Sequence, residues 1–138
     1  MKKFSSLLIS FTCTVLMMYN AQAQCNFIAD DCAPNIVPFV SDGQSRRALV
    51  EEGDTVEFFV TFYANNDYRI QACPGLVLDH IYWSVWDTEK HLLFENLKHS
   101  NTNQWDFHFT GTVNTLIRAC LPKGSELGCL VMLVGFKD

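Results

Sequence analysis

The sequence lacks the short motifs that mark common catalytic and metal sites. It has no Gly-x-Ser-x-Gly, no Cys-x-x-Cys, and no cysteine–histidine cluster at the spacing of zinc ligands. These absences argue against a nucleophile-elbow hydrolase, a thioredoxin-like redox site and a zinc site. The sequence therefore predicts no cofactor, no metal and no catalytic residues, and favours a protein that is not an enzyme.

Basic residues are also scarce. The chain has 10 Lys and Arg against 15 Asp and Glu, for a formal net charge of −5. Lys2 and Lys3 belong to the N-terminal leader described below, and without them the net charge is −7. A nucleic-acid partner needs a basic surface to neutralise phosphates, and anionic lipid needs the same. We therefore expect neither partner.

The first residues have the pattern of a secretory signal peptide. Met1-Lys2-Lys3 is positively charged, residues 4–19 are mostly apolar, and Ala21-Gln22-Ala23 fits a cleavage site. This predicts a signal peptide over residues 1–23 and a mature chain that begins at Gln24. The protein would then be exported to the periplasm, the outer-membrane surface or the medium.

Two other interpretations of the leader are open. A transmembrane anchor would need a longer apolar stretch, and a cleavage site would not follow it directly. We therefore expect no transmembrane segment in the mature chain. A lipoprotein would carry its lipid on Cys25, but Gln24 occupies the position where a small residue is expected.

Patterning predicts one all-β domain over residues 24–138. Residues 24–50 contain Pro34, Pro38 and Gly43 and are predicted to be irregular, with a short edge strand possible near residues 36–40. Residues 51–138 form the predicted core. Apolar residues alternate in short segments separated by turn residues: Thr55–Tyr63, Tyr68–Cys73, His80–Asp87, His91–Phe94, Trp105–Phe109, Thr115–Leu121 and Cys129–Phe136. This pattern is typical of a β-sandwich or barrel, and we expect a single antiparallel β-sandwich of about seven to eight strands.

Two of these segments carry further predictions. In the first, Val56, Phe58, Val60 and Phe62 alternate and should face the core. The last, residues 129–136, is apolar almost throughout, which is typical of a strand buried on both faces.

Five cysteines remain after the leader, and in an oxidising compartment they should form disulfides. Cys25 and Cys32 lie seven residues apart and fit a local bridge. Cys129 begins a strand and could pair with Cys73 or with Cys120, each of which ends one. The odd count leaves at least one cysteine free or paired between molecules.

The strand and turn motifs resemble those of a known group of proteins. The matching residues are Glu52-Gly53-Asp54, Tyr68-Arg69-Ile70, Leu93-Phe94-Glu95-Asn96, Trp105-Asp106-Phe107 and the ending from Gly128 to Lys137. The chain resembles small exported β-sandwich proteins of Bacteroidetes-type bacteria, and more loosely the jelly-roll, pre-peptidase C-terminal domains of bacterial secreted peptidases. The resemblance implies a Cys73–Cys129 disulfide and makes Cys120 the odd thiol. It carries no activity.

Acidic residues and histidines are only weak candidates for catalytic or metal-binding residues. Asp79-His80 and Asp106/His108 could serve a hydrolase, although Asp106 and His108 fall on the solvated face of their strand. Carboxylate pairs for a glycosidase could come from Asp79, Asp87 and Glu89. Calcium could bind Asp30, Asp31 and Asp42, but no calcium-loop motif is present.

The aromatic residues of the segment His80–Asp87 suggest a binding face. Trp83 and Trp86 have opposite parity on one strand, so they cannot both face the same core. Tyr82 and Trp86 would then lie on a face that binds a ligand, or in a second buried layer. We expect an exported, non-enzymatic structural or partner-binding module whose partner is an envelope or surface protein, or a glycan. The alternatives are a carbohydrate- or peptide-binding jelly roll and a small secreted hydrolase.

Overall fold

The computed structural model describes residues 23–75 and 78–137. The predicted signal peptide, apart from residue 23, lies outside the described residues. An α-helix over residues 23–32 leads into the 3-10 helix η1 (Ala33–Ile36). The strands are β1 (Val40–Val50), β2 (Thr55–Phe62), β3 (Asn66–Cys73), β4 (Tyr82–Asp87), β5 (Leu92–Glu95), β6 (Gln104–Phe109), β7 (Val113–Cys120) and β8 (Gly128–Lys137). A second 3-10 helix, η2 (Asn96–His99), lies between β5 and β6.

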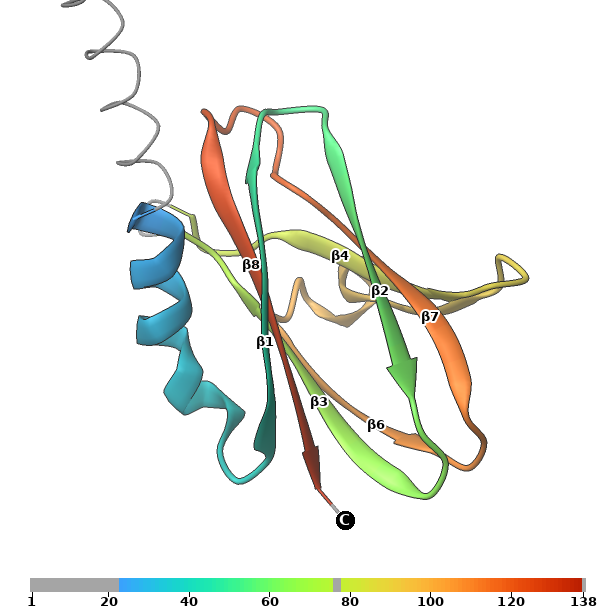
Figure 1. Cartoon of the computed structure of the whole chain (residues 1–138). Coiled ribbons are helices and arrows are strands. Elements are labelled where there is room, and N and C mark those ends of the chain that lie inside the picture. The colour runs from blue at the N-terminus through green and yellow to red at the C-terminus, as the bar shows by residue number, and fades with distance from the viewer. Residues whose placement is uncertain (1–22, 76–77, 138) are drawn as a thin grey trace, which may run out of the picture.

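The strands form two four-stranded antiparallel sheets. Their orders are β1-β8-β3-β6 and β2-β7-β4-β5, and one face of each sheet contributes to a shared core. The N-terminal helix lies along the sheet that contains β8 (Figure 1). The predicted all-β, antiparallel sandwich of seven to eight strands is confirmed.

Alternation of side chains along the strands builds the core. In β2, Val60 and Phe62 are buried while Glu57, Phe59 and Thr61 are exposed, as their parity predicts. Phe62 lies at the centre of an aromatic cluster, with its ring centroid 4.7 Å from that of Phe109. Stacked aromatic pairs of this kind add to the free energy gained by burial alone.

β8 is buried on both faces, which confirms the prediction made for residues 129–136. Leu130 and Met132 enter the sandwich core, while Val131 and Leu133 face the opposite way. On that opposite side they pack against Ala29, Cys32 and Ile36 of the N-terminal segment. The apolar run of β8 therefore reflects two separate contacts, one with the other sheet and one with the helix.

The prediction that residues 24–50 are irregular is wrong. Residues 23–32 are helical, and Val40–Val50 is an eleven-residue edge strand paired with β8. Cys25, Ile28, Ala29 and Cys32 are spaced as one apolar face of a helix, and this face packs on β8 and β3. β1 looked irregular because an edge strand exposed to solvent carries polar residues and because a bulge separates Ser41 from Ser45.

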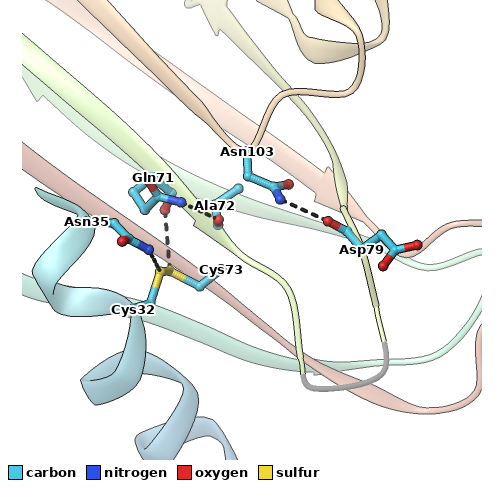
Figure 2. Close-up of a disulfide and its surroundings, with 7 residues drawn as sticks. All are labelled: Cys32, Asn35, Gln71, Ala72, Cys73, Asp79 and Asn103. Carbon is cyan, nitrogen blue, oxygen red and sulfur yellow. Dashed lines mark hydrogen bonds between the residues drawn. A yellow bond between two sulfur atoms is a disulfide. The ribbon is translucent and has the colours of Figure 1, made fainter.

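The expected disulfide pairing is also wrong. The structure joins Cys25 to Cys129 and Cys32 to Cys73, so that both bridges run from the helix to the sheet. Figure 2 shows the second bridge, where the helix meets the end of β3. Cys120 carries a free thiol.

Geometry explains why the expected pairs do not form. Cys25 and Cys32 lie two turns apart on one helix, roughly 10 Å along its axis, which is too far for a disulfide. Cys73 pairs in register with Val131, so Cys129 lies diagonal to it at roughly 7–8 Å between Cα atoms. The helix supplies a closer partner for each strand cysteine, with Cα–Cα distances of 5.4 and 6.0 Å.

Candidate functional site

The two sheets differ in what covers their outer faces. The helix over residues 23–32 and η1 pack on the outer face of β8 and β3. The outer face of the sheet β2-β7-β4-β5 has no comparable hydrophobic cluster among the described residues, and Phe59 on it is 78% exposed. We call this second face the open face. It is the surface on which the predicted aromatics, Tyr82 and Trp86, are found.

A row of apolar side chains crosses the open face. The strand register places Phe59 of β2 opposite Leu116 of β7, Leu116 opposite Trp86 of β4, and Trp86 opposite Leu92 of β5. Four neighbouring strands span roughly 14 Å, so these side chains form one continuous stripe. Phe59 and Leu92 are exposed at its two ends, and Leu116 and Trp86 are half-buried between them. We call these four residues the apolar row.

A polar row runs beside the apolar row and holds Trp86 in position. Arg118 donates to Glu57 at 2.8 Å, and its guanidinium lies 5.4 Å from the centre of the Trp86 ring. The indole N–H of Trp86 donates to Ser84 Oγ at 2.8 Å. Trp86 therefore offers its remaining surface in a fixed orientation, which lowers the entropy that a partner must remove on binding.

A hollow of about 230 Å³ lies next to Trp86 on the open face. Its lining includes Tyr82, Trp86, Leu97 and the free thiol of Cys120. Burial raises the pKa of the Cys120 thiol, so the sulfur stays protonated and behaves as an apolar surface at neutral pH. The hollow is therefore a mostly apolar depression at one side of the row.

Asn96 also lines this hollow, and it is not among the predicted site residues. Its side chain is fully buried, accepts a hydrogen bond from the Trp83 N–H at 3.0 Å and donates to the Ile81 carbonyl at 2.7 Å. It also donates to the Thr102 carbonyl at 3.2 Å. A buried amide with all of these partners ties β4 to the η2 turn. In the sequence Asn96 stands out only as part of the motif Leu93-Phe94-Glu95-Asn96, one of those on which the resemblance rests.

The acidic and histidine candidates do not form a catalytic pair with one another. Asp106 makes a bidentate ion pair with Arg69, whose guanidinium donates to the two carboxylate oxygens at 2.7 and 2.8 Å. His108 instead contacts Asp67 at 2.6 Å, and both of these side chains are more than half exposed. A catalytic base needs a nucleophile within hydrogen-bond reach, and the described partners of Asp106 and His108 include none.

Asp79 and His80 line a different hollow, of about 440 Å³, together with Ser125. The Asp79 carbonyl accepts a hydrogen bond from Asn103 at 3.0 Å, and Figure 2 shows the Asp79 carboxylate directed away from Asn103. His80 Nε2 is buried without a hydrogen-bond partner in the described chain. No hydrogen bond within residues 23–75 and 78–137 joins His80 to Ser125, so the three do not form a triad.

The calcium and glycosidase candidates are likewise separate. Asp42 is paired with Arg46 at 2.9 Å, and Asp30 and Asp31 lie on the helix. Asp87 accepts hydrogen bonds from the backbone and side chain of His91, and the backbone bond in particular lowers the pKa of its carboxyl. In the described part of the chain no three acidic, histidine or cysteine side chains gather as metal ligands.

Comparison with known proteins identifies a similar fold. No protein-family model matches the chain, and no curated protein does. Among solved structures, the fold is similar to that of PliG from Aeromonas hydrophila, a periplasmic lysozyme inhibitor of g-type lysozyme, with a TM-score of 0.55 and 12% sequence identity. The match covers 72% of this chain and 89% of PliG. At this identity the likeness shows a shared fold.

Among the described helices, none has the length and apolar character needed to cross a membrane.

Proposed function

We propose that this protein is an exported, non-enzymatic module that binds another protein through its open face. The main support for the proposal is the apolar row, in which the large apolar residue Phe59 is 78% exposed to solvent. Rows of exposed aromatic and aliphatic side chains with a fixed orientation are typical of protein interfaces. Two disulfides support export, since such bonds persist in oxidising compartments. The similar fold of PliG, a periplasmic protein, supports the same location.

A glycan partner is less well supported than a protein. Sugar binding uses an open aromatic face together with several polar groups that fix the hydroxyls. Trp86 is half-buried, its indole N–H already donates to Ser84, and Arg118 lies over its ring. The apolar row offers no hydrogen-bonding side chain at Phe59, Leu116 or Leu92, so it suits an apolar protein surface.

Site-specific photo-cross-linking in the native host would test the open face. A photoreactive phenylalanine analogue would replace Phe59, and a control would carry it at Leu127, which is 56% exposed on a loop outside the apolar row. We expect a protein cross-linked from position 59 and none from position 127. The identified protein is then purified and its affinity measured by calorimetry.

Point variants give the quantitative test of that partner. Phe59→Asp should weaken binding by about tenfold or more, as for a residue central to an interface, whereas Leu127→Asp should change it by less than about twofold. Equal affinity for both variants would remove the open face from the interface. Binding of an oligosaccharide with a loss on Phe59→Asp would instead identify a glycan-binding module.

Inhibition of a lysozyme is a second candidate, favoured by the match to most of the PliG chain. The test is the rate at which g-type lysozyme clears a suspension of peptidoglycan, with and without equimolar protein. Inhibition that Phe59→Asp relieves would make lysozyme the partner of the open face. An unchanged rate at a large excess of protein would exclude this enzyme as the target.

A further inference from the structure

The two sheets leave an opening between their neighbouring edge strands, β1 and β2. Figure 1 shows these strands diverging from the turn that joins them. A cleft of about 550 Å³ lies in this opening. Its lining combines apolar core residues, Val60, Tyr68, Val134 and Phe136, with residues at the rim such as Arg46. At this cleft, core side chains can therefore be reached by a bound molecule.

β2 is an unprotected edge. It pairs with β7 over eight residues in continuous register, and no strand within residues 23–75 and 78–137 pairs with its other side. Its sequence, Thr55–Phe62, contains no proline and no lysine, and its one charged residue, Glu57, is paired with Arg118 of β7. Proteins usually protect an edge with bulges, charges or proline, because unpaired backbone N–H and C=O groups can bind another chain.

β1, the neighbouring edge, is interrupted by a bulge, whereas β2 is continuous. The bulge lies between Ser41 and Ser45, and Gly43 there has a φ of 75°. Asp42 and Arg46 form an ion pair at 2.9 Å along the same strand, at the rim of the cleft. Of the two edge strands that border the cleft, β2 is therefore the one more available for pairing.

We propose that the free edge of β2 binds an extended segment of the protein partner as an additional β-strand. This role presupposes the protein partner proposed above and deepens it by naming the chemistry of recognition. A row of backbone donors and acceptors is matched by another polypeptide backbone, whereas a glycan or lipid has no such repeat.

The geometry also specifies the side chains of the bound segment. Alternate residues of an added strand point to opposite faces of the sheet. One set would enter the cleft against Val60, Val134 and Phe136, so these residues should be apolar. The other set would lie beside Phe59 on the open face, and would extend the apolar row by one strand. The segment should therefore be apolar at several positions and extended over about five to eight residues.

The probe for this surface is a phage-displayed library of linear peptides, each about a dozen residues long and able to span the eight residues of β2. Selection uses the folded, disulfide-bonded protein. We expect enrichment of peptides with apolar residues at alternating positions. Bound peptide should slow amide hydrogen exchange of alternate β2 residues by about tenfold or more, and leave the opposite edge strand β5 unchanged.

An N-methyl scan of the selected peptide provides a matched control that leaves the protein unaltered. Methylation of backbone nitrogens that face β2 should lower affinity by about tenfold, because each removes one donor. Methylation at the intervening positions should change affinity by less than about threefold. Equal sensitivity at all positions, or binding without protection of β2 amides, would overturn strand addition.

Two further outcomes separate this inference from the proposed function. If no linear peptide is enriched while position 59 still cross-links a protein, strand addition is wrong and the protein-binding function stands. If β2 amides become protected as protein concentration rises without peptide, a second copy of the chain occupies the edge. That result would also overturn the inference.

Discussion

At the scale of single residues, Gly135 shows how closely the N-terminal segment packs on β8. A Cβ atom added at Gly135 would lie 2.6 Å from Ile36 Cγ2 and 2.8 Å from Phe39 Cβ. We therefore predict that Gly135→Ala lowers the free energy of unfolding by about 1–3 kcal/mol, since the segment must move away from the strand. Urea denaturation measures the difference. Gly111→Ala, where a Cβ would meet nothing within 4 Å, should stay within about 0.5 kcal/mol of wild type. Equal effects of both substitutions would contradict this packing.

Cys120 gives a prediction for pH dependence. Burial raises the pKa of its thiol above the ordinary value of 9.0, so a smaller fraction is thiolate at pH 8 than in an unfolded chain. Iodoacetamide reacts with the thiolate, and we expect native protein to be alkylated several-fold more slowly at pH 8 than protein in urea. The native rate should still be rising above pH 9. Mass spectrometry follows the reaction, and Cys120→Ser should show no alkylation. A native rate equal to the unfolded one would contradict burial of the thiol.

At the scale of elements, two disulfides hold the helix over residues 23–32 on the sheet. The bridges span 104 residues for Cys25–Cys129 and 41 residues for Cys32–Cys73. Loop-closure entropy then predicts that replacing either pair by serine lowers the free energy of unfolding, by about 5 kcal/mol for the longer loop and about 4 kcal/mol for the shorter.

Both double variants belong in a Cys120→Ser background, so that the free thiol cannot exchange with the remaining bridge. Urea denaturation gives the loss of stability, and hydrogen exchange follows the helix. Loss of one bridge should keep the helix amides protected. Loss of both should make them exchange rapidly, because a short helix is marginal without tertiary contacts. Persistent protection without either bridge would show that apolar packing alone holds the helix.

The strands could be predicted from the sequence, whereas the N-terminal helix could not. Period-two alternation repeats along β2, β3 and β4, so each strand can be located from local sequence. The helical face of Cys25, Ile28, Ala29 and Cys32 covers only two turns, and two of its four residues are cysteines, which in an exported protein indicate disulfides rather than an apolar helix face. For β1 the sequence predicts at most a short edge strand near residues 36–40, because the pairing of Val40–Val50 with β8 is non-local and its exposed side chains are polar.

The candidate site was predictable only in part. Parity on β4 separates Trp86 from Trp83, and the structure buries Trp83 while Trp86 lies on the open face. The apolar row needs the register of β2, β7, β4 and β5, which no single segment contains. Phe59 belonged to the half-polar face of its strand, and only the pairing across β7 aligns it with Leu116 and Trp86. Pairing between distant strands is the information that local patterns lack.

At the scale of the whole molecule, the sandwich is asymmetric. One outer face is closed by the helix and two covalent bridges, and the other presents an apolar row beside an unprotected edge strand. The helix gives the first sheet the cover that a small domain needs, because fewer than 120 residues follow the predicted leader. The exposed surface of the second sheet adds little to stability, which is consistent with a role in binding.

The disulfides on the helix-covered face predict the N-terminus and the cysteine linkages of the exported chain. Cys25 cannot both carry a lipid and bridge to Cys129, because a single sulfur atom would have to make both bonds. We therefore expect non-reducing peptide mapping of protein from the native envelope and medium to give a mature N-terminus at Gln24. The map should contain the linked peptides Cys25–Cys129 and Cys32–Cys73, with Cys120 in neither. An acylated Cys25 would leave Cys129 without its bridge and detach the first turn of the helix from β8. A Cys73–Cys129 linkage would remove both covalent links between the helix and the sheet, since Cys73 and Cys129 are the strand partners of the two bridges.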